Sequence, residues 1–153
     1  MSRQKAIGTR FESAFTVWMR DALGDERVER AALHGNADMG DVHGLFAHGL
    51  RGIAECKCHK AFSPSSTALL EGWFSETFEE KCNADADFAL LVVHVPGVGV
   101  TSKSPTFGNN LVYVQLSDLM ALSMQPEPRF CGERWVSMRL RDVAALMTGD
   151  TVE

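Results

Sequence analysis

The sequence lacks a long apolar stretch, which limits where the protein can reside. Its longest apolar run, FALLVV at residues 88–93, is far shorter than the roughly 18 apolar residues that cross a bilayer. The basic segment MSRQKAIGTRF at the start is followed by an amphipathic pattern and not by the continuous apolar core of a signal peptide. We therefore expect no membrane span and a cytoplasmic protein.

Cysteine is also scarce, with four residues in 153. Cys56 and Cys58 are too close together for an ordinary bridge, so reduced thiols are expected. A structural zinc site is an alternative, because four of the five histidines lie near these thiols: His34, His43, His48 and His59. The Cys-x-Cys-His sequence has no second ligand pair at the usual spacing, which disfavours zinc.

Basic residues are outnumbered, since 15 Lys and Arg face 20 Asp and Glu for a formal net charge of −5. This balance argues against indiscriminate nucleic-acid binding. The acid is concentrated late in the chain: residues 1–60 carry nine basic and eight acidic side chains, and residues 61–153 carry six and twelve. A face built from the first part can still attract phosphate.

Hydrophobic periodicity predicts an α/β protein with a mixed sheet flanked by helices. Nothing divides the chain, so residues 1–153 are interpreted as one domain. The predicted helices cover 8–23, about 66–82, 117–124 and 141–149, and the predicted strands cover 28–33, 41–46, 51–59, 87–95, 110–116 and 134–140. The form of the 96–110 loop stays open.

Two helices have recognisable inward faces. In the first helix the inward positions are Phe11, Phe15, Trp18 and Ala22, with Ala14 and Val17 widening the stripe and Glu12 at its edge. In the second helix they are Leu70, Trp73 or Phe74, and Phe78.

The segment RGIAECKCHK places polar groups inside an apolar strand. Side chains two residues apart share one face of a strand, so Glu55 and Lys57 point one way while Cys56 and Cys58 point the other. We expect the cysteines to pack beneath a helix. A buried carboxylate and a buried lysine each cost several kcal/mol unless they are paired or bound to metal, so compensation is expected here.

Asp41 is the expected partner of this pair, because it begins the preceding predicted strand. Asp41 and Glu55 converge if they belong to two arms of one hairpin, and a divalent cation relieves their repulsion. Oxygen ligands of this kind favour Mg²⁺ or Mn²⁺ over Zn²⁺. With Lys57 positioning water or a phosphate oxygen, the inferred chemistry is hydrolysis of a phosphodiester.

This pattern resembles the PD-(D/E)xK nuclease superfamily, and within it the archaeal-type Holliday junction resolvases and their phage relatives. The likeness covers about residues 7–122 and includes the GTRFE helix start with Glu12. It implies a restriction-endonuclease-like fold in which Asp41, Glu55 and the Cys56 backbone carbonyl bind Mg²⁺, with Mn²⁺ able to substitute. It also implies catalytic roles for Glu12 and Lys57, branched DNA as the substrate, and a homodimer.

The chain departs from this family pattern at two places. Gly40 stands before Asp41 where the family has proline, and the strand–helix extension over about 125–153 has no counterpart. Candidate DNA contacts are Arg10, Arg51 and Lys60.

Other interpretations stay open. The protein is alternatively a restriction-type or repair endonuclease acting on duplex DNA, or a catalytically inactive nucleic-acid-binding or interaction domain. Glu55 and Lys57 are alternatively a surface ion pair, and Glu12 a first-turn helix acid. Asp38 is the first substitute if Asp41 is misassigned.

Overall fold

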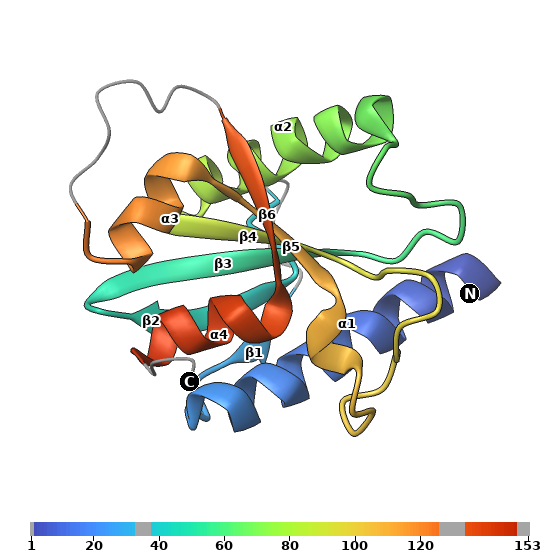
Figure 1. Ribbon diagram of the computed structural model, residues 1–153, viewed down its shortest axis with the longest axis horizontal. Coiled ribbons are helices and arrows are strands. Elements are labelled where there is room, and N and C mark those ends of the chain that lie inside the picture. Colours follow the sequence, from blue (N-terminus) through green and yellow to red (C-terminus); the bar gives the residue numbers. More distant parts are fainter. Residues whose placement is uncertain (1, 33–37, 126–133, 150–153) are drawn as a thin grey trace.

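A mixed sheet of six strands forms the centre of the protein, with its strands in sequence order from β1 to β6 (Figure 1). The computed structural model describes residues 2–32, 38–125 and 134–149. The strands are β1 (Glu29–Arg30), β2 (Val42–Ala47), β3 (Leu50–Lys57), β4 (Phe88–Val93), β5 (Leu111–Gln115) and β6 (Trp135–Arg139). Neighbours β3 and β4 are parallel, and every other neighbouring pair is antiparallel.

Helices cover both faces of this sheet. They are α1 (Arg3–Leu23), α2 (Thr67–Asn83), α3 (Leu116–Leu122) and α4 (Leu140–Thr148), and a 3₁₀ turn, η1, covers Phe107–Asn109. Helices α1 and α4 pack on one face, and α2 packs on the other. The predicted α/β fold with a mixed sheet flanked by helices is therefore confirmed. Within the described ranges, none of the helices has the length and apolar character that crossing a membrane requires.

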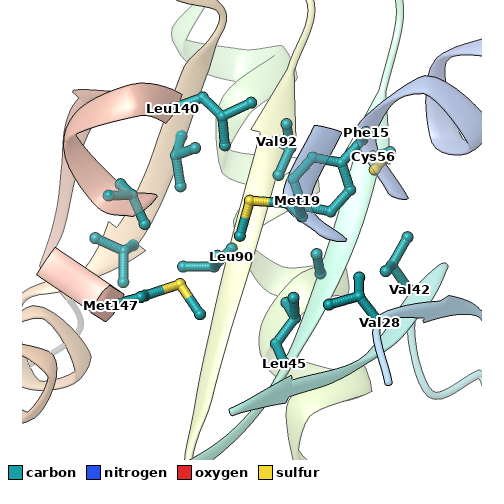
Figure 2. Packing of buried hydrophobic residues seen from close by; sticks show 14 of the residues in the cluster. Phe15, Met19, Val28, Val42, Leu45, Cys56, Leu90, Val92, Leu140 and Met147 are labelled. Carbon is teal, nitrogen blue, oxygen red and sulfur yellow. The ribbon is translucent and has the colours of Figure 1, made fainter. Parts of the chain in front are cut away.

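The larger apolar core lies between the sheet and the α1–α4 layer. Figure 2 shows Phe15 and Met19 of α1 and Met147 of α4 packed against Leu90 and Val92 of β4. Strands β2 and β3 add side chains to the same layer, so the elements near the site are held by one continuous core. The C-terminal strand and helix belong to it too, since β6 pairs with β5 and α4 packs on α1.

Helix α1 begins earlier than predicted, because Ser2 caps it by accepting a hydrogen bond from the Lys5 backbone N–H at 3.2 Å. It ends at Gly24 in the left-handed region. Its buried row is Phe11, Phe15, Thr16 and Met19, with Trp18 partly buried. The predicted inward placement of Val17 and Ala22 is wrong, because the i, i+4 row from Phe11 through Phe15 to Met19 faces the sheet and leaves both exposed.

Helix α2 corrects a second prediction. Leu70 is buried and Trp73 and Phe74 pack partly against the sheet, but Phe78 is 44% exposed and not inward. The inward positions of the next turns are taken by Thr77 and Glu80, both almost completely buried. The inner face of α2 thus changes from apolar to polar toward its C-terminal end.

Loops account for the remaining differences. Of the strand predicted over 28–33, only the two residues of β1 form a strand. Residue 33, the last of the predicted range, lies outside the described ranges. The 96–110 loop is fixed by the buried side chain of Asn110, which accepts a hydrogen bond from the Val95 backbone N–H at 3.0 Å and donates one to the Phe107 carbonyl at 2.9 Å. This loop is consequently a defined part of the fold.

Candidate metal centre

Strand β3 separates its alternating side chains as predicted. Cys56 is buried in the core beneath α1, which confirms its packing role, and Cys58 packs at the edge of that core. Glu55 and Lys57 point to the opposite face, toward α2. The carboxyl group of Glu55 is nearly inaccessible, because this residue is only 5% exposed.

Asp41 reaches Glu55 from the chain segment that leads into β2. Its backbone N–H donates to the Ala54 carbonyl at 2.9 Å, and its Oδ2 accepts from the Cys56 backbone N–H at 2.9 Å. The carboxyl groups of Asp41 and Glu55 lie within hydrogen-bonding reach of one another. In a strand the N–H and C=O of one residue point to the same edge, so the Cys56 carbonyl faces the edge where Asp41 lies.

Gly40 has a backbone conformation that excludes the proline found at this position in the nucleases that the sequence resembles. Its φ is +92°, a left-handed conformation that proline cannot adopt. A Cβ at this position would also lie 2.9 Å from the Ile53 Cδ1. The approach of Asp41 to β3 therefore depends on glycine at residue 40.

Lys57 is the cation at the centre of the site. Its Nζ lies 3.1 Å from Glu55 Oε1 and 2.9 Å from Glu76 Oε1 of α2. Burial acts to lower the pKa of Lys57, but the charges and hydrogen bonds of Glu55 and Glu76 hold that pKa above its ordinary value. The amine consequently remains an ammonium at neutral pH.

Three further acidic residues lie on this face: Asp38, Glu76 and Glu80. The sequence indicated Asp38 only as a substitute for Asp41, and it indicated neither glutamate. Each offers a carboxylate oxygen, and these oxygens lie within 4.8 Å of one another. Glu76 and Glu80 are four residues apart and share one side of α2. The available signal was the spacing of Glu80 from Leu70 and Thr77, which continues the inward row of the helix.

The carboxylates of the site are crowded and short of donors. Burial raises the pKa of Glu55 well above its ordinary range, and the neighbouring Asp41 and Glu80 raise it further. Burial is also the main cause that raises the pKa of Asp41. Among the described residues, no N–H or hydroxyl donor reaches Glu55 Oε2 or either carboxylate oxygen of Glu80. Buried oxygens without donors fit a hard divalent cation, held by Asp41, Glu55 and the Cys56 carbonyl.

Glu12 approaches from α1 and is the outermost of the predicted residues. Its Oε2 accepts from Arg30 Nη2 of β1 at 3.0 Å, and its side chain is 21% exposed. Burial raises the pKa of Glu12, and the charge of Asp41 raises it further, while Arg30 and Lys57 act in the opposite direction. Glu12 therefore shares the electrostatic field of the site without touching its centre.

The predicted DNA contacts fall in different places. Arg10 and Lys60 are exposed on α1 and just beyond β3. Arg51 lies at the far end of β3 and donates to the carbonyls of Ala84 and Asp85, where α2 ends. Arg51 thus has a structural use as a helix cap, because cations stabilise the C-terminal end of a helix dipole.

The zinc alternative gains no support from the described residues. Cys56 is turned into the core, whereas the His59 ring packs near Trp73 on the α2 side, with ring centroids 6.4 Å apart. His34 and Cys131 lie outside the described residues. The one group of three or more potential ligand side chains close enough to share an ion in the described ranges is acidic.

Comparison with known proteins leaves these residues to be interpreted on their own geometry. No protein-family model, no curated protein and no solved structure matches the chain.

Proposed function

We propose that the protein is a metal-dependent DNA endonuclease that hydrolyses phosphodiester bonds. The observation that carries this proposal is the meeting of Asp41, Glu55 and Lys57, with oxygen Oε2 of Glu55 buried and without a donor. Two carboxylates and a backbone carbonyl suit Mg²⁺ or Mn²⁺. The spacing of these residues in sequence also resembles that of the PD-(D/E)xK nucleases.

Each residue of the site has a proposed role that follows from its charge and its position. A bound Mg²⁺ would lower the pKa of a coordinated water and neutralise charge on the phosphate. Asp41 is held in a fixed orientation by the Cys56 N–H, so it offers its free oxygen without losing side-chain freedom on binding. Lys57 keeps its proton beside Glu55 and Glu76, which suits a donor to a phosphate oxygen or to the attacking water.

We further propose branched DNA as the preferred substrate and a homodimer as the working form. Both proposals follow from the resemblance to junction resolvases, which cut two strands symmetrically. The exposed side chains of Arg10 and Lys60 are the proposed backbone contacts. A duplex endonuclease is the competing proposal. Cleavage of a four-way junction compared with cleavage of a linear duplex distinguishes the two.

Cleavage tests the proposal directly. The purified protein is incubated with a labelled four-way junction and a matched linear duplex, with Mg²⁺ or with EDTA. We expect paired, symmetrical cuts in the junction that require Mg²⁺. Glu55→Gln and Lys57→Ala are each expected to reduce the rate at least about 100-fold, because each removes a group that acts on the reacting phosphate.

Glu79→Gln is the matched control for Glu55→Gln, because Glu79 is exposed on the same helix as Glu76 and Glu80 and each substitution replaces one carboxyl group by an amide. Its cutting rate should equal that of the wild type. Unchanged cutting by folded Glu55→Gln would refute the proposed mechanism, and cutting of the duplex alone would support the duplex endonuclease. Absence of any cutting would favour an inactive binding domain.

A further inference from the structure

Carboxylates continue from the Asp41–Glu55 pair onto α2, beyond the pair that the sequence pattern identifies. Asp38, Glu76 and Glu80 each place one carboxylate oxygen within 4.8 Å of the others. Asp38 comes from the segment before β2, and the two glutamates come from adjacent turns of α2. An acidic cluster alone is ordinary on a protein surface. The burial and the hydrogen-bond partners of its buried member show whether this cluster fits a cation.

Glu80 is that buried member. It is 1% exposed, its carboxylate belongs to the cluster, and no amide, ammonium or alcohol group of the described residues donates to its oxygens, whose hydrogen-bonding neighbour is the Glu55 carboxyl group. Native proteins nearly always provide partners for buried polar atoms. A buried carboxylate whose neighbours are other carboxylates needs either a shared proton or a cation bound between them, and at neutral pH a divalent cation can replace such a proton.

Lys57 does not meet this need. Its ammonium contacts one oxygen of Glu55 and one oxygen of Glu76, and it makes no contact with Glu80 or Asp38. The contact with Lys57 uses only Oε1 of Glu76, so the second oxygen is free for another ligand. The ammonium of Lys57 thus contacts two of the five carboxyl groups here. Contacts or charge interactions connect these five groups: Asp38, Asp41, Glu55, Glu76 and Glu80.

Asp38 is held against α2 before any ligand binds. Its Oδ1 accepts from the Gly40 backbone N–H at 3.1 Å, and its carbonyl accepts from Asn83 Nδ2 at 2.8 Å. Because these bonds use the carbonyl and one carboxylate oxygen, Oδ2 of Asp38 remains for a cation. The cost of ordering this side chain is thus reduced in advance.

We propose that Asp38, Glu76 and Glu80 form a second divalent-cation site beside the Asp41–Glu55 pair. Three carboxylates select a hard cation such as Mg²⁺, Mn²⁺ or Ca²⁺. Glu80 lies within hydrogen-bonding reach of Glu55 as well as near Asp38 and Glu76, so the two cations are neighbours. The second cation fastens the segment before β2 to α2. This inference rests on the carboxylates alone and holds whether or not the protein cuts DNA.

Counting bound Mn²⁺ tests the second site. The full chain is treated with EDTA and exchanged into chelator-free buffer, and free Mn²⁺ is then measured by electron paramagnetic resonance during a titration. We expect two ions for the wild type and one for the double variant Asp38→Asn/Glu76→Gln. These two side chains are exposed or half exposed, so the fold should survive, which circular dichroism checks. The double variant Glu71→Gln/Glu79→Gln carries the same charge change on exposed positions and should keep both ions.

The outcomes separate this inference from the nuclease proposal. Asp41→Asn should also bind one ion, because it removes the other site. The second site is overturned if the wild type binds fewer than two ions, or if Asp38→Asn/Glu76→Gln binds as many as the wild type. Two ions in a protein that cuts no DNA would support the second site and refute the nuclease proposal alone.

Discussion

The burial of Glu80 indicates that the inner face of α2 is part of a functional site. It occupies an inward position of α2 where an apolar residue would pack well, and its burial costs free energy unless something offsets it. The pKa of Glu80 is raised to about 7, chiefly by burial; a hydrogen bond with the Glu55 carboxyl group acts to lower this pKa, and the charges of Asp38, Glu76 and Asp41 act to raise it. A carboxylate kept in such a place is typical of a functional site.

Replacing Glu80 by glutamine should therefore stabilise the protein when no metal is present. The amide removes one negative charge and supplies N–H donors toward the Glu55 carboxyl group. In EDTA at pH 8 we expect Glu80→Gln to raise the free energy of unfolding by about 1–2 kcal/mol, measured by urea denaturation. Glu79→Gln, on the exposed side of α2, should change it by less than about 0.5 kcal/mol.

With saturating Mg²⁺ the wild type should have the higher free energy of unfolding, because the Glu80→Gln variant has lost a cation ligand. A Glu80→Gln protein that is less stable than the wild type in EDTA would show that Glu80 is satisfied by its protein neighbours, and the metal interpretation of α2 would lose its basis.

At the scale of elements, periodicity predicted the type of most helices and strands, and the alternation in β3 placed Glu55 and Lys57 correctly on one face. The inward row of α2 was predicted less well, since the apolar Phe78 was preferred over the charged Glu80. Hydrophobicity ranks side chains by the usual cost of burial, so it overlooks a carboxylate that is buried for a function.

Loop residues and arginines were harder to assign. Asp38 was predicted only as a substitute for Asp41, because it lies in a loop, where no period relates neighbouring residues in space. Arg51 stays a predicted phosphate contact, but the sequence does not show that it also donates to the carbonyls at the end of α2. The proximity of β2, β3 and α2 is a tertiary property, and only the folded chain displays it.

Asp118 is the main polar link between α2, β4 and α3. Its Oδ1 accepts from Lys81 Nζ at 2.8 Å, its Oδ2 accepts from the Ala89 backbone N–H at 3.2 Å, and its side chain is almost fully buried. Asp118→Ala should lower the free energy of unfolding by about 3 kcal/mol, because it leaves the ammonium and the N–H without their partner. Urea denaturation measures this change.

The matched control is Asp142→Ala, which breaks the exposed Arg139–Asp142 contact at 3.5 Å. It should cost at most about 1 kcal/mol, since exposed ion pairs and first-turn acids contribute little. Equal losses in the two variants would contradict the anchoring role given to Asp118.

For the whole molecule, the acidic cluster makes stability depend on pH. The folded-state pKa of Glu80 is about 7, above its ordinary value of 4.5. Asp41 and Glu55 shift in the same direction. The folded protein thus holds protons that the unfolded chain has released, and stability that is complete below about pH 4.5 is lost as the pH rises through 7.

In EDTA we therefore expect the free energy of unfolding to fall by about 1–3 kcal/mol between pH 5 and pH 8. Mg²⁺ should reverse the fall, because a ligand that binds only the folded state at 100 times its Kd adds about 2.7 kcal/mol. Urea denaturation at each pH, with and without Mg²⁺, gives both values. Stability that rises toward pH 8 in EDTA would contradict the assignment of these carboxyls as protonated without metal.

Anomalous diffraction from crystals grown with Mn²⁺ locates the divalent cation that Asp41 and Glu55 are proposed to hold beside Lys57. We expect an Mn²⁺ peak bonded to oxygens of both carboxylates and to the Cys56 carbonyl, at distances of about 2 Å. A folded protein with no peak within bonding distance of Asp41 and Glu55 at saturating Mn²⁺ would contradict it.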